Sequence, residues 1–257
     1  MSEKLVRPPL AYEDAEFLQT PEARSVRMLS EYLKPLRVFR QHKIHDTVAF
    51  FGSARITQDG PMGEYYEAAR GLAGKVTQWS DSLHRSSRHF VVSTGGGPGI
   101  MEAANRGASE AGGKTIGLNI RLPFEQQPNP YITPELSLEF GYFFLRKFWF
   151  AYLAKALVVF PGGFGTLDEM FELLTLVQTQ KLDRRIQVIL YGSEYWDSVI
   201  KLDPMEEWGA ISAEDQGLIQ RADTPEDAMA LLSAHLTTHH LEPESPVTEP
   251  ALAKTRA

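Results

Sequence analysis

The stretch ALVVFPGGFGTLDE, residues 156–169, decides how this 257-residue chain is interpreted. It begins with five apolar residues, continues through a segment with three glycines, and ends in helix-forming residues. A buried strand that enters a helix through such a turn presents free backbone N–H groups at the positive end of the helix dipole. The stretch therefore predicts a phosphate-binding loop between a buried strand and a helix. A tight strand-to-helix turn without a ligand is the alternative.

The same alternation of apolar runs and helical segments extends along the chain. Strands are expected at residues 47–51, 89–93, 115–120, 136–140, 156–160 and 187–191. Helices are expected at residues 63–79, 98–112, 142–154, 167–180 and 225–236. Short apolar runs that each lead into a helix indicate a parallel sheet buried on both faces. The expected fold class is α/β, a Rossmann-like parallel sheet with helices on both faces and an N-terminal helical extension.

Three regions are expected along the chain. Residues 1–42 form the helical extension, with a helix over residues 21–40 that Thr20 could cap. Its packing stripe is expected to consist of Val26, Leu29, Leu33 and Leu36. Residues 43–237 form the Rossmann-like nucleotide-binding domain. Residues 238–257 are polar and rich in Pro and Glu, which is typical of a disordered tail.

Composition excludes several classes of protein. The formal net charge is −7 and no run of Lys and Arg occurs, so no nucleic-acid partner is expected. The chain has no cysteine, which excludes disulfides and thiolate metal sites, and no His/Asp/Glu grouping has the spacing of metal ligands. Neither a signal-peptide core nor an apolar stretch of about 18 residues is present. We therefore expect a cytoplasmic protein without metal or membrane contact.

Ligands of open parallel sheets bind beyond the carboxyl ends of the strands. Three expected strands end there in glycine-bearing loops, at residues 52–55, 95–99 and 161–166. Neither long loop is a standard nucleotide fingerprint, because Ile100 breaks the dinucleotide pattern and Ala108 breaks the Walker pattern. ATPase and NAD-dehydrogenase functions are therefore disfavoured.

Three charged side chains near these loops each allow two interpretations. Thr166 and Glu169 have the spacing of a capping box, but Glu169 could instead face the ligand and orient water or stabilise a cation. Arg146 belongs either to a solvated stripe of an aromatic helix or to a phosphate or carboxylate contact. Glu102 could bind ligand hydroxyls or only complement a helix dipole.

Together these motifs resemble the LONELY GUY (LOG) family. PGGFGTLDE, residues 161–169, matches the P-G-G-x-G-T-x-x-E motif of that family, and Arg146-Lys147 resembles its R-K pair. GGGPGIMEAAN, residues 95–105, is similar to its first glycine loop. The resemblance covers roughly residues 45–195. The family was long labelled lysine decarboxylase-like, yet no lysine here has a discernible pyridoxal-phosphate context.

The resemblance implies a hydrolase that cleaves the N-glycosidic bond of a purine nucleoside 5′-monophosphate, of cytokinin type or AMP. The products would be the free base and ribose 5-phosphate. Family members are homodimers and need no cofactor. Residues Phe143, Phe144 and Leu145 precede the R-K pair where short plant-type enzymes have M-x-x, so the chain is more similar to a longer bacterial branch.

The family roles carry over to matching positions of this chain. Arg146 and Glu169 are the expected catalytic residues, with Glu169 stabilising an oxocarbenium-like state and activating water. The expected substrate-binding residues are Gly52, Ser53, Arg55, Gly96, Gly97, Glu102, Lys147, Pro161, Gly162, Gly163, Gly165 and Thr166.

Two other functions use the same kind of fold. A non-catalytic carrier of a phosphorylated ligand, such as molybdenum cofactor, would need the same anion-binding loops. The presence of both Arg146 and Glu169 favours the enzyme over the carrier. A DNA-processing Rossmann protein is disfavoured by the acidic charge balance.

Overall fold

The structure is a computed structural model that describes residues 7–123, 127–182 and 186–241. Within these residues, no helix combines the length and the apolar character needed to cross a lipid bilayer. Most of the tail expected at residues 238–257 lies outside the described residues. Residues 238–240 are not part of a tail, because they form the last turn of a helix.

A seven-stranded parallel sheet forms the centre of the molecule, in the order β4-β3-β2-β1-β5-β6-β7. The strands are β1 (Thr47–Phe51), β2 (Val91–Thr94), β3 (Thr115–Ile120), β4 (Ser137–Phe140), β5 (Ala154–Val159), β6 (Gln187–Tyr191) and β7 (Ile219–Ala222). The strand order reverses at β1, which pairs with β2 on one side and β5 on the other. This confirms the expected α/β class and places a topological switch point between β1 and β5.

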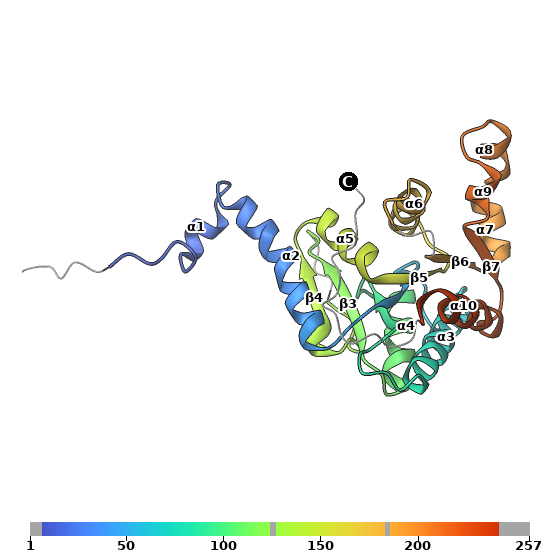
Figure 1. The fold of residues 1–257 in the computed structure, drawn as a ribbon, viewed down its shortest axis with the longest axis horizontal. Coiled ribbons are helices and arrows are strands. Elements are labelled where there is room, and N and C mark those ends of the chain that lie inside the picture. The colour runs from blue at the N-terminus through green and yellow to red at the C-terminus, as the bar shows by residue number, and fades with distance from the viewer. Residues whose placement is uncertain (1–6, 124–126, 183–185, 242–257) are drawn as a thin grey trace, which may run out of the picture.

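Helices cover both faces of the sheet (Figure 1). One core contains side chains from α2 (Arg24–Gln41), α5 (Phe143–Leu153) and α6 (Phe164–Gln178). The opposite core contains side chains from α3 (Gly63–Ser82), α4 (Ile100–Glu110) and α10 (Pro225–His240). The central strands β1, β2 and β6 are buried along their whole length, which is why apolar residues follow one another in each of them instead of alternating with polar ones.

Smaller elements complete the fold. They are α1 (Ala15–Gln19), the 3₁₀ turn η1 (Pro134–Leu136), α7 (Ser193–Val199), α8 (Asp203–Glu207) and α9 (Ala213–Gln216). Helix α1 lies away from the sheet, whereas α7, α8 and α9 gather at its β6–β7 end (Figure 1). Strand β7 was not expected from the sequence, because it is an edge strand with exposed polar residues at its centre.

The N-terminal helix differs from the expectation in its start and its orientation. Helix α2 begins after Ala23, and Thr20 ends α1 instead of capping α2. Most of the expected packing stripe faces solvent, with Val26, Leu29 and Leu33 roughly half exposed. The buried side of α2 carries Pro35 and Phe39, and the Phe39 ring lies 5.4 Å from that of Trp149 in α5. Aromatic packing against α5 therefore fixes how α2 is rotated.

Candidate active site

A cavity of about 890 Å³ opens at the carboxyl ends of β1 and β5, at the switch point of the sheet. Ten of the residues expected from the sequence line it: Gly52, Ser53, Arg55, Arg146, Pro161, Gly162, Gly163, Gly165, Thr166 and Glu169. They come from the loop after β1, the loop after β5, and helices α5 and α6. The sheet topology therefore brings together segments that are more than a hundred residues apart in the chain.

Backbone hydrogen bonds join the three glycine loops. The Ser53 N–H donates to the Pro161 carbonyl at 3.0 Å, and the Ile100 N–H donates to the Ser53 carbonyl at 3.1 Å. Gly99 has φ of +71°, and a Cβ there would lie 2.3 Å from the Ser53 carbonyl oxygen. Only glycine fits this approach, so the loop after β1 is held tightly between the other two.

Helix α6 begins at the cavity without a side-chain cap. Its N-cap is Gly163, and the first helical backbone bond runs from the Leu167 N–H to the Gly163 carbonyl at 3.0 Å. The N–H groups of the first helical turn have no acceptor within the helix itself. A Cβ at Gly163 or Gly165 would meet nothing within 4 Å, so this turn is open to a ligand. The arrangement suits an anion such as phosphate.

The capping-box interpretation of Thr166 and Glu169 is wrong. Thr166 lies inside α6, two residues after the helix begins, and it does not cap it. Its side chain instead covers Gly162, where an added Cβ would lie 2.2 Å from the Thr166 hydroxyl oxygen. Glu169 is consequently not needed to close the helix, and its carboxylate is used elsewhere.

Glu169 pairs with Arg146 inside the cavity. The Arg146 Nη2 donates to the Glu169 Oε1, and about a tenth of each side chain is exposed. The guanidinium lies over the rings of Phe143 and Phe150, at 5.2 Å and 6.0 Å from their centroids. Among the described residues, Arg146 Nε has no hydrogen-bond partner. The guanidinium thus holds the carboxylate and keeps further donor capacity.

Burial is the largest influence on the pKa of Glu169. Removal from water raises the pKa of this carboxyl, and Asp168 raises it further, whereas Arg146 and Lys147 act in the opposite direction. The net effect places the pKa above the ordinary value of 4.5. A carboxyl group with a raised pKa beside a cavity is a common property of acid–base residues in active sites.

Four residues expected at the site do not line the cavity. Lys147 Nζ pairs with Asp168 at 2.8 Å and with Glu172 at 2.9 Å. Glu102 Oε1 accepts a bond of 3.0 Å from the Tyr66 hydroxyl. The carbonyls of Gly96 and Gly97 accept from Asn129 Nδ2 at 3.2 Å and 3.0 Å. These groups therefore already have protein partners.

The cavity also contains residues that the sequence analysis did not select. Met101, Phe164, Tyr195 and Val199 line it. The Tyr195 hydroxyl donates to the Gly162 carbonyl at 2.9 Å, so it fixes the loop after β5. Phe164 is 94% exposed at the cavity entrance. Phe164 and Met101 could have been found from their positions inside the two glycine motifs. Tyr195 and Val199 could not, since helix α7, which carries them, was not expected.

The family model and the sequence relatives indicate one family. The family model described as "Possible lysine decarboxylase" matches residues 101–232. A probable cytokinin riboside 5′-monophosphate phosphoribohydrolase of Arabidopsis thaliana, LOG6, is 24% identical over 183 residues, covering 71% of this chain and 87% of that protein. A probable cytokinin riboside 5′-monophosphate phosphoribohydrolase of rice (Oryza sativa subsp. japonica), LOGL5, is 27% identical over 153 residues, covering 58% of this chain and 61% of that protein.

A solved structure shares the fold. The X-ray structure of TM1055 superimposes with a TM-score of 0.52 at 22% identity, covering 74% of this chain and 99% of that one. The molybdenum cofactor binding protein of Rippkaea orientalis gives a TM-score of 0.48 at 22% identity, covering 74% and 96% of the two chains.

An acidic residue introduced at the start of α6 should weaken anion binding without lowering the stability of the fold. Gly163→Asp places a favourable N-cap residue on the helix, so the free energy of unfolding should stay within about 1 kcal/mol of wild type. The added carboxylate competes for the free N–H groups and repels phosphate, so the affinity for ribose 5-phosphate should fall at least tenfold in calorimetric titration. Gly71→Asp, at an exposed site of α3, adds the same charge away from the cavity and should bind normally. Equal affinity in both variants would contradict an anion site at α6.

Proposed function

Because the chain belongs to the LONELY GUY family, whose model carries the description possible lysine decarboxylase, we propose that it hydrolyses the N-glycosidic bond of a purine nucleoside 5′-monophosphate. The products are the free base and ribose 5-phosphate. The observation that carries this proposal is the buried Arg146–Glu169 pair, which lies in the same cavity as the uncapped start of α6.

The two features fit the two ends of a ribose phosphate. In the proposal, the 5′-phosphate binds to the N–H groups of the first turn of α6, next to Gly162, Gly163 and Gly165. Glu169 follows Thr166 by three residues, which is about 4.5 Å along the helix axis. A phosphate at the helix end therefore leaves the sugar beside the Glu169 carboxylate. Ser53 and Arg55, which line the cavity from the loop after β1, contact the ribose or base.

The chemistry follows from the charge that develops during cleavage. Loss of the base leaves an oxocarbenium-like sugar, and a nearby carboxylate stabilises this cation. The electron pair of the broken bond leaves with the base, and the same carboxylate accepts a proton from the attacking water. That proton balances the one that the departing base takes up to become the free base. Arg146 positions the carboxylate, and its guanidinium limits the rise in pKa that burial causes. Burial and the guanidinium therefore act in opposite directions on the pKa of Glu169, which stays above its ordinary value.

Lysine decarboxylation fits this cavity poorly. Pyridoxal-phosphate enzymes need a lysine to hold the cofactor as a Schiff base. None of the described residues that line the cavity is a lysine. Lys147, the lysine next to Arg146, is paired with Asp168 and Glu172. The site residues therefore favour hydrolysis over decarboxylation.

A turnover assay tests the proposal. Purified protein incubated with AMP, or with isopentenyladenosine monophosphate, should release ribose 5-phosphate and free base in equal amounts, measured by chromatography and a coupled sugar-phosphate assay. Comparison of the two substrates gives the preferred base. Tight binding of a molybdopterin without release of base from any purine monophosphate would overturn the enzyme proposal and favour the carrier.

The role of Glu169 has a distinct signature in the pH profile. Activity should fall as the pH decreases through the raised pKa of Glu169, so the acid limb of kcat/KM should lie above pH 4.5, because only the ionised carboxylate stabilises the cation. Glu169→Gln should lose at least ~100-fold in kcat and retain the fold, as seen by circular dichroism.

Glu172→Gln is the matched control, because Glu172 lies on the same helix and pairs with Lys147 instead of Arg146. It should keep the rate, and its acid limb should move only slightly towards lower pH, because the charge of Glu172 makes the smallest contribution to the raised pKa of Glu169. A Glu169→Gln variant with wild-type kcat would show that the pair serves structure alone.

We further propose that the protein is a homodimer. Three aromatic side chains on α5, those of Phe143, Phe144 and Phe148, are 50%, 54% and 37% exposed. A cluster of solvent-exposed apolar side chains commonly marks an interface.

Light scattering should give twice the chain mass. Phe144→Glu should shift the measured mass towards the monomer, whereas Trp208→Glu, at an exposed aromatic remote from α5, should leave it unchanged. A monomeric wild-type protein would contradict the dimer.

A further inference from the structure

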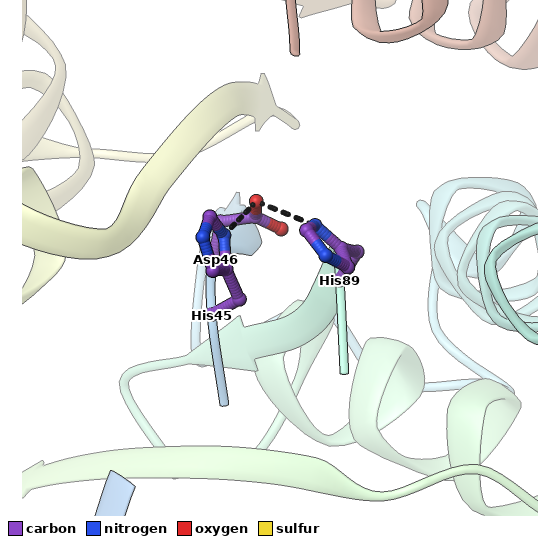
Figure 2. Close-up of side chains that lie close together, drawn as sticks. All are labelled: His45, Asp46 and His89. Atoms are coloured by element: carbon purple, nitrogen blue, oxygen red, sulfur yellow. Dashed lines mark hydrogen bonds and ion pairs between the residues drawn. The ribbon is translucent and has the colours of Figure 1, made fainter. Parts of the chain in front are cut away.

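Three potential metal ligands meet at the opposite edge of the sheet from the cavity (Figure 2). His45 and Asp46 directly precede β1, and His89 lies two residues before β2. Because β1 and β2 are parallel neighbours, with Thr47 opposite Val91, their amino ends meet at this edge. Residues 43 positions apart in the chain thus form one cluster.

Backbone contacts fix the positions of all three residues, and for His89 the contact is its carbonyl, which accepts from the Ser80 hydroxyl at 2.5 Å. The His45 N–H donates to the Arg88 carbonyl at 2.9 Å, and the Val91 N–H donates to the Asp46 carbonyl at 3.1 Å. The site therefore lies at the ends of two core strands and not on a flexible surface loop. Rigid strands of this kind hold ligand side chains in place before an ion binds.

The donor atoms are arranged around a single carboxylate oxygen. Asp46 Oδ2 lies 2.8 Å from His45 Nδ1 and 3.0 Å from His89 Nδ1, and all three ligand atoms lie within 4.8 Å of one another. Two ligands of a tetrahedral zinc ion, each bound at ~2.1 Å, are roughly 3.4 Å apart. Small movements of the side chains would open the cluster enough to admit an ion.

The remaining polar atoms of the buried ligands have partners that orient them. Asp46 Oδ1 accepts from the Phe90 N–H at 2.5 Å, which leaves Oδ2 directed at the histidines. His89 Nε2 lies 3.1 Å from the Ser87 hydroxyl, which fixes the ring with Nδ1 towards Asp46. Metal-binding histidines in proteins typically have such a partner on the second ring nitrogen.

The three side chains differ in their exposure to solvent. Asp46 and His89 are 1% and 10% exposed, whereas the His45 side chain is 54% exposed. An ion can therefore enter from the His45 side, where a water molecule would complete the coordination. Lys43 and Arg88 line a neighbouring cavity of about 620 Å³ together with His89. Their positive charges oppose a cation, which favours an exchangeable ion over a permanent one.

We propose that His45, Asp46 and His89 bind one divalent transition-metal ion of the zinc class. Two imidazoles and a carboxylate are ligands that zinc accepts, and three protein ligands leave one position open. The ion links the amino ends of β1 and β2 and stabilises the folded chain by binding it preferentially. The sequence predicted no metal site, because spacing along the chain does not show which residues the pairing of β1 and β2 brings together.

The test uses the full-length, untagged protein after treatment with a chelator. Rings of His235, His239 and His240 lie close together on α10 and could bind metal independently, so a background variant carries His239→Gln and His240→Gln. Zn²⁺ titration of this background by calorimetry should give one site, and Co²⁺ should give the visible absorption bands of a tetrahedral complex. Zn²⁺ should also raise the thermal midpoint.

Two ligand variants and one control identify the site. His89→Gln and the half-exposed His45→Gln should each weaken Zn²⁺ binding at least tenfold and remove the thermal shift. His84→Asn is the control, because His84 lines the same neighbouring cavity and its φ of +48° is tolerated by asparagine. It should bind Zn²⁺ like the background.

Circular dichroism and the thermal midpoint of the metal-free variants check folding. Because His45 is at the surface, His45→Gln remains informative if His89→Gln fails to fold. Absence of Zn²⁺ binding in the background, or unchanged binding in His45→Gln, would overturn the proposal. The cluster would then serve only to link β1 and β2 through the hydrogen bonds of Asp46 with His45 and His89.

Discussion

The buried ion pair between Arg146 and Glu169 is the interaction on which the account of this protein depends. Removing a carboxylate from water costs free energy, which the nearby guanidinium offsets. If the guanidinium is lost, the buried carboxylate keeps a charge that nothing compensates. The pair forms only because α5 and α6 pack on the same face of the sheet, where residues such as Trp149 and Met170 share one core. Packing that has no direct contact with a ligand therefore decides whether the carboxylate faces the cavity.

The sheet topology supplies the rest of the site. The switch point between β1 and β5 directs two loops towards one cavity, and hydrogen bonds through Ser53 lock them together. The uncapped start of α6 then provides an electropositive end in the same cavity as the buried carboxylate. The other edge of the same strands carries the cluster around Asp46, so the two ends of β1 have separate chemical roles.

Sequence patterns predicted the fold well where burial is uniform and poorly elsewhere. The strands buried on both faces are apolar runs, whereas β7 has polar residues and was missed. Motif spacing selected Arg146 and Glu169, but it could not show that Glu102 bonds to Tyr66 or that Lys147 bonds to Glu172. Such partners depend on how helices pack against each other. The cluster of His45, Asp46 and His89 depends on the register between β1 and β2, which no local sequence pattern predicts.

A crystal structure of the Glu169→Gln variant with bound AMP tests the central claim most directly. The account predicts that the phosphate accepts hydrogen bonds from the N–H groups at the start of α6. It also predicts that C1′ of the ribose lies against the side chain at position 169, with Arg146 in contact with that side chain. A phosphate bound away from α6, or a nucleotide whose sugar lies away from residue 169, would contradict it.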